Sequence, residues 1–280
     1  MSSPLKWLRR KVELHRLSAR RVTLEEELTC YFKAPIRLRP ASAKGGYDEI
    51  YLAYTNAQKH AVVRLNNPYK TVNDPIGPWD PGVPLEATGR LDREWEAYQC
   101  LVQSSYSPKP LWRGEDVLVC EWLDWTRASV HLSRTRNDIL KTSALIFPIL
   151  TYMHGQDLTH LDLNLGNFLL SPDLTKAVVI DFEFGPQAWV SLEQQMAFDY
   201  LRLLNDCLRA RRGGKYLLEQ LSSWLDLLGA HMDERAKDAN LDFKVEEVKK
   251  ENDPALKTDS EEQREVDLNN IMIKTSKENL

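Results

Sequence analysis

Apolar and polar positions alternate in short runs through the first half of the chain. The runs at 36–39, 49–54 and 60–65 are each bounded by turn-forming residues, a pattern typical of β-strands. A fourth run at 117–122, VLVCEW, is short, apolar and rich in β-branched residues, which predicts a buried strand. Between the third and fourth runs, the spacing of apolar residues predicts a helix over 91–102. The first half is therefore predicted to contain a small sheet and one helix.

The second half changes mainly to a helical period. Strands and helices are predicted there in the order 138–153 (helix), 168–170 and 177–180 (strands), 192–209 and 216–228 (helices). The first of these helices is apolar nearly all round, which indicates burial, and Pro148 is expected to kink it. Strands, one helix, more strands and then a mostly helical half make the outline of an α+β fold with two lobes.

Changes in composition give the expected boundaries. We expect a basic N-terminal segment at 1–34, a β-rich lobe at 35–124, a helical lobe at 125–232 and a charged tail at 233–280. Within the first lobe, residues 66–89 contain five prolines with several Gly and Asp residues, which predicts an irregular insert. Beyond Met232 the chain is highly charged and nearly free of aromatic residues, which predicts disorder.

Composition and charge exclude several functional classes. The chain has 280 residues, a net charge of -4 and a sequence pI of about 5.9, so nucleic acid is not expected as its main partner. Its four cysteines are far apart and form no CxxC pair, which argues against a zinc site or a disulfide framework and favours a reducing, cytoplasmic compartment. No apolar run is long enough to span a bilayer.

The basic N-terminus allows two interpretations. Residues 1–21 carry seven Lys or Arg residues against the single Glu13. They could form a solvated helix, or they could attach the protein peripherally to an anionic surface such as the inner membrane. Leu5, Leu8 and Val12 share one helical face, but two further apolar residues, Trp7 and Leu14, fall opposite. The apolar stripe is therefore imperfect, and both interpretations stay open.

The strongest chemical signal lies in residues 159–185. His160, Asp162 and Asn167 form the pattern HxDxxxxN, and Asp181-Phe182-Glu183 follows after two short apolar runs. In phosphoryl transfer, a carboxylate on a rigid loop accepts the proton of the attacking hydroxyl, a role that suits Asp162. Mg²⁺ prefers oxygen ligands, which Asn167 and Asp181 would supply next to the phosphates of ATP. The pattern predicts an ATP- and Mg²⁺-dependent kinase.

This segment resembles the catalytic and metal-binding loops of the protein-kinase-like superfamily. The DLNxxNxLL form at 162–170 is similar to that of bacterial lipopolysaccharide-core sugar (Kdo and heptose) kinases, especially Kdo kinases. The IDFE stretch at 180–183 also resembles choline kinases and aminoglycoside phosphotransferases. The resemblance implies a two-lobed protein-kinase-like fold with a β-rich first lobe and a mainly helical second lobe. In these kinases a histidine at the position of His154 often closes the preceding helix.

The resemblance also assigns residues of the nucleotide site. Gly45 and Gly46 stand where the family has its nucleotide-covering turn, although a plain hairpin turn is an alternative. Arg64 replaces the usual phosphate-binding lysine, and Glu94 would pair with it from the following helix. Otherwise Arg64 is an exposed strand residue, and Glu94 or its competitor Glu96 is a solvated helix charge.

Two further assignments follow from the same resemblance. The stretch from Glu121 to Leu123 would be the hinge whose backbone binds adenine, and Asp199 would support the catalytic loop. No APE-like motif follows Asp181, and the intervening loop is short, which disfavours a protein kinase regulated by an activation loop. We therefore expect a hydroxyl-bearing acceptor, in the first place a lipid-linked lipopolysaccharide-core sugar. The alternatives are a small-molecule kinase of the aminoglycoside or choline type, a small serine/threonine kinase, and a pseudokinase acting as a binding module.

Overall fold

The computed structural model describes residues 11–41, 47–70 and 80–239. The chain divides into two compact units, which are described separately. The sheet unit comprises Met1–Gly77, Pro84–Asp124 and Val179–Gly185. The helical unit comprises Pro78–Val83, Trp125–Val178 and Pro186–Leu280.

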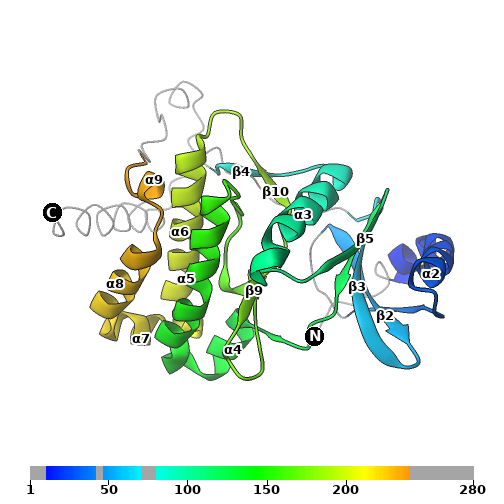
Figure 1. Ribbon diagram of the computed structural model, residues 1–280, viewed down its shortest axis with the longest axis horizontal. Coiled ribbons are helices and arrows are strands. Elements are labelled where there is room, and N and C mark those ends of the chain that lie inside the picture. The colour runs from blue at the N-terminus through cyan, green and yellow to red at the C-terminus, as the bar shows by residue number, and fades with distance from the viewer. Residues whose placement is uncertain (1–10, 42–46, 71–79, 240–280) are drawn as a thin grey trace. The chain divides into compact units, whose positions relative to one another are not determined.

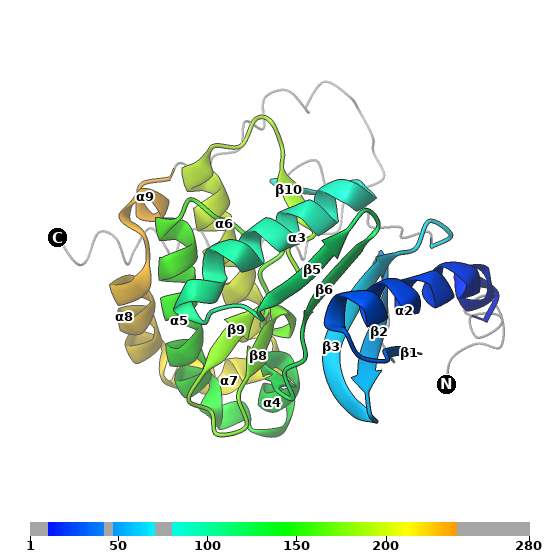
Figure 2. The same cartoon turned by 45° about the vertical axis from the view of Figure 1, so that its right-hand side comes forward.

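The sheet unit contains a five-stranded antiparallel sheet in the order β1-β2-β3-β6-β5 (Figures 1 and 2). Its strands are β1 (Arg37–Pro40), β2 (Asp48–Thr55), β3 (Gln58–Asn66), β5 (Pro110–Gly114) and β6 (Val117–Glu121). The four strands expected from the sequence are confirmed, and β5 is an additional one. Asn56 and Ala57 connect β2 to β3 with positive φ angles of 49° and 65°, the backbone that a tight two-residue hairpin requires.

Two helices accompany this sheet. Helix α2 (Ser18–Phe32) buries Leu24 and Leu28 in one apolar core with the inward-facing residues of the strands, among them Val63 and Val119. Helix α3 (Ala87–Leu101) packs along β5 and β6 and ends in the short 3-10 helix η1 (Val102–Ser104) (Figure 2). The sheet is therefore stabilised by an N-terminal helix as well as by the helix that the sequence predicted.

The insert at 66–89 is more regular than its prolines indicated. It includes β4 (Gly82–Pro84), and α3 begins at Ala87 instead of at residue 91. The N–H of Leu85, between them, bonds to the carbonyl oxygen of Glu183 at 3.2 Å, beside β10 (Phe184–Pro186). This partner lies far along the chain, so local composition could not reveal it. Residues 71–79 of the insert lie outside the described residues.

The helical unit is built mainly from α4 (Ala128–Arg134), α5 (Ile139–Gly155), α6 (Leu192–Leu208), α7 (Gly214–Glu219), α8 (Leu221–His231) and α9 (Glu234–Lys237). A small sheet of β7 (Thr126–Arg127), β8 (Phe168–Leu170) and β9 (Ala177–Val179) and the 3-10 helices η2 (Arg136–Asp138), η3 (Leu165–Asn167) and η4 (Ala210–Arg212) complete it. Helix α5 is buried as expected and continues through Pro148 as one helix. On α8, Trp224 packs edge-on against Phe147 of α5, with ring centroids 5.3 Å apart. The predicted α+β architecture is confirmed.

Two expectations for the C-terminal region were wrong. The helix predicted over 216–228 is two helices, α7 and α8, because Gln220 leaves the helical conformation with φ -122° and ψ 26°. Order also continues past Met232: Arg235, at α9, forms ion pairs with Asp157 at 2.7 Å and Asp233 at 3.0 Å. These contacts attach residues that the sequence assigned to the tail, while 240–280 lie outside the described residues.

At the N-terminus, Val12 is 43% exposed, whereas Leu17, Leu24 and Leu28 face the core. Leu5, Trp7 and Leu8 lie outside the described residues, so the membrane interpretation stays a prediction. Among the helices that the structure describes, none is long and apolar enough to cross a membrane.

Candidate functional site

Arg64 occupies the middle of the sheet, on β3. Its Cα lies opposite Ile50 of β2 and Leu118 of β6. Its neighbours Val63 and Leu65 point into the apolar core, so by the alternation of a strand Arg64 points to the other face. The arginine side chain is nevertheless only 8% exposed, which excludes the interpretation as an exposed strand residue.

Glu94 on α3 explains this burial. Its carboxylate forms an ion pair with Nη1 of Arg64 and also accepts a hydrogen bond of 2.5 Å from the hydroxyl of Tyr98. Glu94 is 1% exposed, whereas Glu96 on the same helix is exposed. The predicted Arg64–Glu94 pair is confirmed, and Glu96 is excluded as the partner.

Three more carboxylates surround the same guanidinium. Asp181 accepts from Nη1 at 2.7 Å, Asp48 accepts from Nη2 at 3.1 Å, and Glu183 also accepts from Nη2. A second arginine, Arg90 of α3, donates to the other oxygen of Asp48 at 2.9 Å. We call these six residues, Asp48, Arg64, Arg90, Glu94, Asp181 and Glu183, the arginine cluster. It combines four carboxylates with two guanidinium groups.

The excess of carboxylates in this buried cluster shifts the pKa values of Arg64 and of two of the acids. Burial alone would lower the pKa of Arg64, but the surrounding carboxylates, Glu94 first, outweigh it and raise that pKa well above its ordinary value. Burial raises the pKa of Glu94, and Arg64 only partly opposes this shift. Burial, with repulsion from Asp181, raises the pKa of Glu183 to about 8. The arginine cluster therefore holds Glu183 close to its titration point at neutral pH.

Two donors in the arginine cluster are without an acceptor among the described residues. The Nε–H groups of Arg64 and Arg90 are buried and have no hydrogen-bond partner among the described residues. An unpaired buried donor is costly, and an anionic oxygen is the acceptor that a guanidinium binds best. Because four carboxylates already surround the two guanidinium groups, a phosphate oxygen can bind them only after displacing a carboxylate.

Asp181 has an unusual backbone. Its φ is 81°, a left-handed conformation that is rare for a residue with a side chain. The next residue, Phe182, is fully buried and packs edge-on against Tyr98, with ring centroids 6.3 Å apart. Packing of Phe182 holds the turn, while the Asp181 side chain remains 33% exposed. The Asp181 carboxylate is therefore partly accessible from outside the arginine cluster.

The predicted hinge begins at Glu121, the last residue of β6. The N–H of Glu121 is bonded to the carbonyl oxygen of Lys109 at 2.9 Å, and its carboxylate accepts the N–H of Lys109 at 2.8 Å. In the described part of the chain, no hydrogen bond involves the backbone of Leu123. The adenine-binding role of this stretch stays a prediction, with Leu123 as the residue whose backbone groups are open. Gly45 and Gly46 lie outside the described residues.

In the helical unit, Asp199 of α6 holds the loop that carries Asp162. Its two carboxylate oxygens accept the backbone N–H groups of His160 at 2.8 Å and Leu161 at 2.7 Å. His154 at the end of α5 lies 3.3 Å from the same carboxylate. Leu161 has a φ of 65°, so these charged hydrogen bonds stabilise a strained turn. The expected support of the loop by Asp199 is confirmed.

Asp162 and Asn167 lie on this loop and are joined by a hydrogen bond. The Nδ2 group of Asn167 donates to the carbonyl oxygen of Asp162 at 3.0 Å. Asn164 donates to the same carbonyl oxygen at 3.0 Å and accepts the N–H of Gly166 at 2.8 Å. The side chain of Asp162, 29% exposed, forms an ion pair with Arg202 of α6. The loop thus presents an accessible carboxylate beside an arginine.

Several of these residues were not found from the sequence. Asp48, Arg90 and Arg202 carried no signal there, because their partners are remote in the chain. Arg202 lies one helical turn after Asp199, and that spacing places both on the side of α6 that faces the loop. Glu183 was visible as part of IDFE, but nothing in the pattern pointed to its contact with Arg64.

The predicted metal ligands belong to different units, Asp181 to the sheet unit and Asn167 to the helical unit. Within the described ranges, no group of three or more His, Cys, Asp or Glu side chains could hold a metal ion by itself. Mg²⁺, however, commonly takes only one or two protein ligands together with phosphate oxygens and waters. An aspartate oxygen and an asparagine oxygen fit that chemistry.

Comparisons with known proteins add no relative to this picture. No family model matches the chain, and no curated protein matches it either. The similarity of residues 159–185 to the protein-kinase-like superfamily therefore stays a prediction. The function has to be inferred from the two groups of residues described above.

Proposed function

We propose that this chain is an ATP-dependent phosphotransferase with the two-lobed protein-kinase-like fold. It would move the γ-phosphate of ATP to a hydroxyl group, with Mg²⁺ bound to the nucleotide. The observation that carries the proposal is the meeting of Arg64, Glu94 and Asp181. These residues come from a strand, a helix and a loop far apart in the sequence. Asp181 was predicted from the motif pattern, and Arg64 and Glu94 from the family resemblance.

In this proposal Arg64 binds a phosphate of the nucleotide. Its unpaired Nε–H and its two Nη groups can bind oxyanions in a fork, a geometry that lysine lacks. Glu94, with Tyr98 bonded to it, orients the guanidinium. The carboxylates of Asp181 and Glu183 compete with phosphate for the same donors. Binding of nucleotide therefore favours their release from Arg64.

Asp181 and Asn167 are the residues proposed to hold Mg²⁺. The exposed side of Asp181 and the amide oxygen of Asn167 offer the hard ligands that this ion prefers. When bound, Mg²⁺ neutralises part of the charge on the transferring phosphate. The hydrogen bond from Nδ2 of Asn167 to the Asp162 carbonyl leaves its amide oxygen available.

Asp162 is the proposed acceptor of the hydroxyl proton. Its carboxylate is accessible, and the loop behind it is fixed by the two hydrogen bonds to Asp199. Fixing the loop matters because a general base must lie within hydrogen-bond reach of the proton. Arg202 would hold the carboxylate in position through its ion pair.

A lipopolysaccharide-core sugar is the acceptor that the resemblance favours, with the protein in the cytoplasm and peripheral on the inner membrane. Amino alcohols and aminoglycosides are the alternative acceptors. A different candidate is a binding module without turnover. The observation in its favour is that Arg64 and Asp162 are both already occupied by partners of opposite charge.

The experiment is a phosphoryl-transfer assay with labelled ATP, magnesium and three acceptor classes: lipid A-core sugars, amino alcohols and aminoglycosides. Wild type should label one class, and Asp162→Asn should abolish transfer while nucleotide binding persists. Asp181→Asn should weaken magnesium-dependent nucleotide binding, and Asn167→Ala should lower turnover. Magnesium-dependent nucleotide binding without transfer to any acceptor would favour the binding module. Full activity of Asp162→Asn would refute the assigned base.

A further inference from the structure

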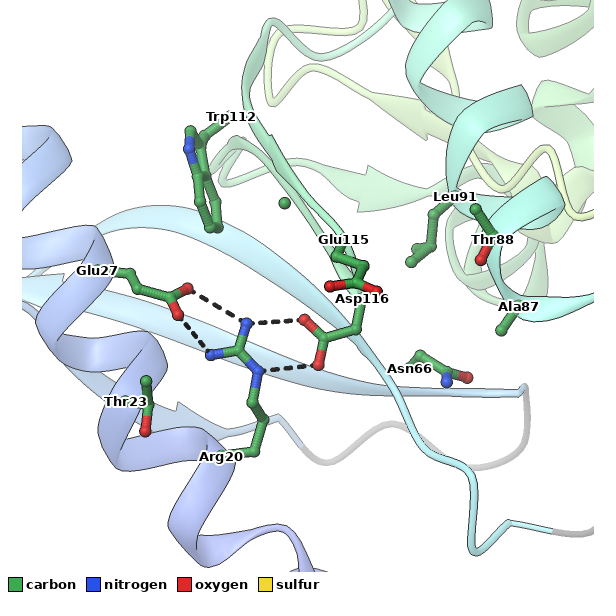
Figure 3. Close-up of a pocket in the computed structure, with 11 residues that line it drawn as sticks. Arg20, Thr23, Glu27, Asn66, Ala87, Thr88, Leu91, Trp112, Glu115 and Asp116 are labelled. Carbon is green, nitrogen blue, oxygen red and sulfur yellow. Dashed lines mark hydrogen bonds and ion pairs between the residues drawn. The ribbon is translucent and has the colours of Figure 1, made fainter.

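A pocket of about 810 Å³ opens in the sheet unit, and none of the predicted site residues lines it. Its walls come from α2, from β5 and the turn into β6, and from the first turns of α3 (Figure 3). This volume lies within the range of roughly 300–1,000 Å³ that is usual for pockets that bind small molecules. The pocket is therefore large enough for an organic ligand.

One wall of the pocket is formed by a fixed ion-pair triad. Arg20 of α2 lies between Glu27 and Asp116, and Figure 3 shows its guanidinium bonded to both. The bonds to Asp116 measure 2.7 and 2.8 Å and those to Glu27 measure 2.9 and 3.2 Å, so both contacts are bidentate. All three nitrogens of the Arg20 guanidinium are thus bonded to carboxylates of this wall.

The remaining charge in the pocket is negative. Glu115 is exposed beside Asp116, and its carboxylate has no ion-pair or hydrogen-bond partner within the described residues. The lining of the pocket therefore contains three carboxylates but one guanidinium, so its net charge is negative; the carboxylates are those of Glu27, Glu115 and Asp116. A cation entering the pocket is attracted, and an anion is repelled.

The pocket also has apolar lining residues. Trp112 of β5 and Leu91 of α3 lie on different sides of it (Figure 3). The indole of Trp112 lies against Gly114, where a Cβ atom would come within 2.7 Å of the ring. Glycine at this position therefore lets the ring lie on the backbone. A flat apolar group can stack on the indole while a charged group reaches the carboxylates.

The walls of the pocket are held together before any ligand binds. Arg113 of β5 forms an ion pair of 2.8 Å with Asp92 of α3, and Arg20 connects α2 to the β5–β6 turn. A preformed pocket loses little conformational entropy when it is filled. Its shape and charge therefore specify the class of ligand.

We propose that this pocket binds a small organic cation, a primary amine or guanidinium carried on an aromatic scaffold. The ammonium group would lie by Glu115 and Asp116, and the scaffold would stack on Trp112. This site does not depend on the proposed phosphotransfer, because it uses none of the same residues.

The test compares two probes with the same ring and opposite charge, tryptamine and indole-3-acetate. Each is titrated into the full ¹⁵N-labelled chain, and the indole N–H resonance of Trp112, assigned with Trp112→Phe, is followed. Tryptamine should shift this resonance in a saturable manner and bind about tenfold more tightly than indole-3-acetate, because the carboxylates of the pocket attract its ammonium group and repel the carboxylate of the other probe.

Glu115→Arg should remove this preference, because it reverses the only unpaired charge among the described lining residues. Glu96→Arg is the matched control: it makes the same change at an exposed site on α3 that does not line the pocket. The proposal is overturned if neither probe shifts Trp112, if both bind equally, if indole-3-acetate binds more tightly, or if the two variants behave alike.

Discussion

Glu183→Gln is the substitution that tests the electrostatics of the arginine cluster most directly. The side chain is only 12% exposed and contacts Nη2 of Arg64. Glutamine keeps the size and an oxygen acceptor for Arg64 but removes the titrating charge. Any change in the pH dependence of stability therefore reports the carboxyl group itself.

The sign and size of the effect follow from the pKa. Folding raises the pKa of Glu183 from its ordinary 4.5 to about 8, first through burial and then through Asp181. Between these two pKa values the folded state binds the proton more tightly than the unfolded state does. Protonated Glu183 therefore contributes fully to the free energy of unfolding below the lower pKa, and this contribution is lost as the pH rises through the higher one. At about 1.4 kcal/mol per pKa unit, wild type should lose roughly 3 kcal/mol between about pH 5 and about pH 8 through this group.

The assay is urea unfolding at several pH values, followed by fluorescence, for wild type, Glu183→Gln and the exposed control Glu96→Gln. From about pH 5 to about pH 8, the free energy of unfolding of wild type should fall by roughly 3 kcal/mol relative to that of Glu183→Gln. The free energy of unfolding of Glu96→Gln should change with pH as that of wild type does. Parallel curves for wild type and Glu183→Gln would show that Glu183 is ionised in the folded state at all these pH values. The proposed charge imbalance would then be wrong.

Two further predictions concern the residues around which each site is built. Arg64→Ala should destabilise the protein by about 3–5 kcal/mol in urea unfolding, because it leaves buried carboxylates without their partner, and it should raise the KM for ATP. Arg64→Lys should recover part of the stability but less of the nucleotide affinity. A wild-type KM in Arg64→Ala would refute the phosphate contact. Asp199→Asn should lower the free energy of unfolding by about 2–4 kcal/mol and speed backbone hydrogen exchange at His160 and Leu161, since one amide oxygen replaces two charged oxygens as acceptor. Equal exchange in Asp199→Asn and in the exposed control Asp226→Asn would refute the support of the loop by Asp199.

Some of the candidate site was predictable because it is encoded in short stretches. His160, Asp162 and Asn167 lie within eight consecutive residues, so their spacing alone indicated a loop with a fixed arrangement. The pairing of Arg64 with Glu94 was predictable only through the motif resemblance, which supplied the alignment of a strand with a helix. Asp48, Arg90 and Arg202 have no such pattern, and they were found only in the structure.

The sequence by itself determined the elements with strong periodicity and the order in which they occur. Strands β2, β3 and β6 and helices α5 and α6 follow from apolar spacing, because burial of one face is a local requirement. It missed β5 and overestimated the helix over 216–228, which breaks at Gln220. A weakly apolar strand such as β5 forms because its neighbour β6 offers a free edge.

Only the tertiary structure decided which charges meet. Four acidic residues from β2, α3 and the segment before β10 converge on Arg64, and Arg20 joins α2 to the β5–β6 turn. Each pair is separated by many residues, so its energy depends on how strands and helices pack and not on neighbouring residues. Burial then sets the strength of these interactions, because a charge removed from water must find a partner wherever the fold provides one.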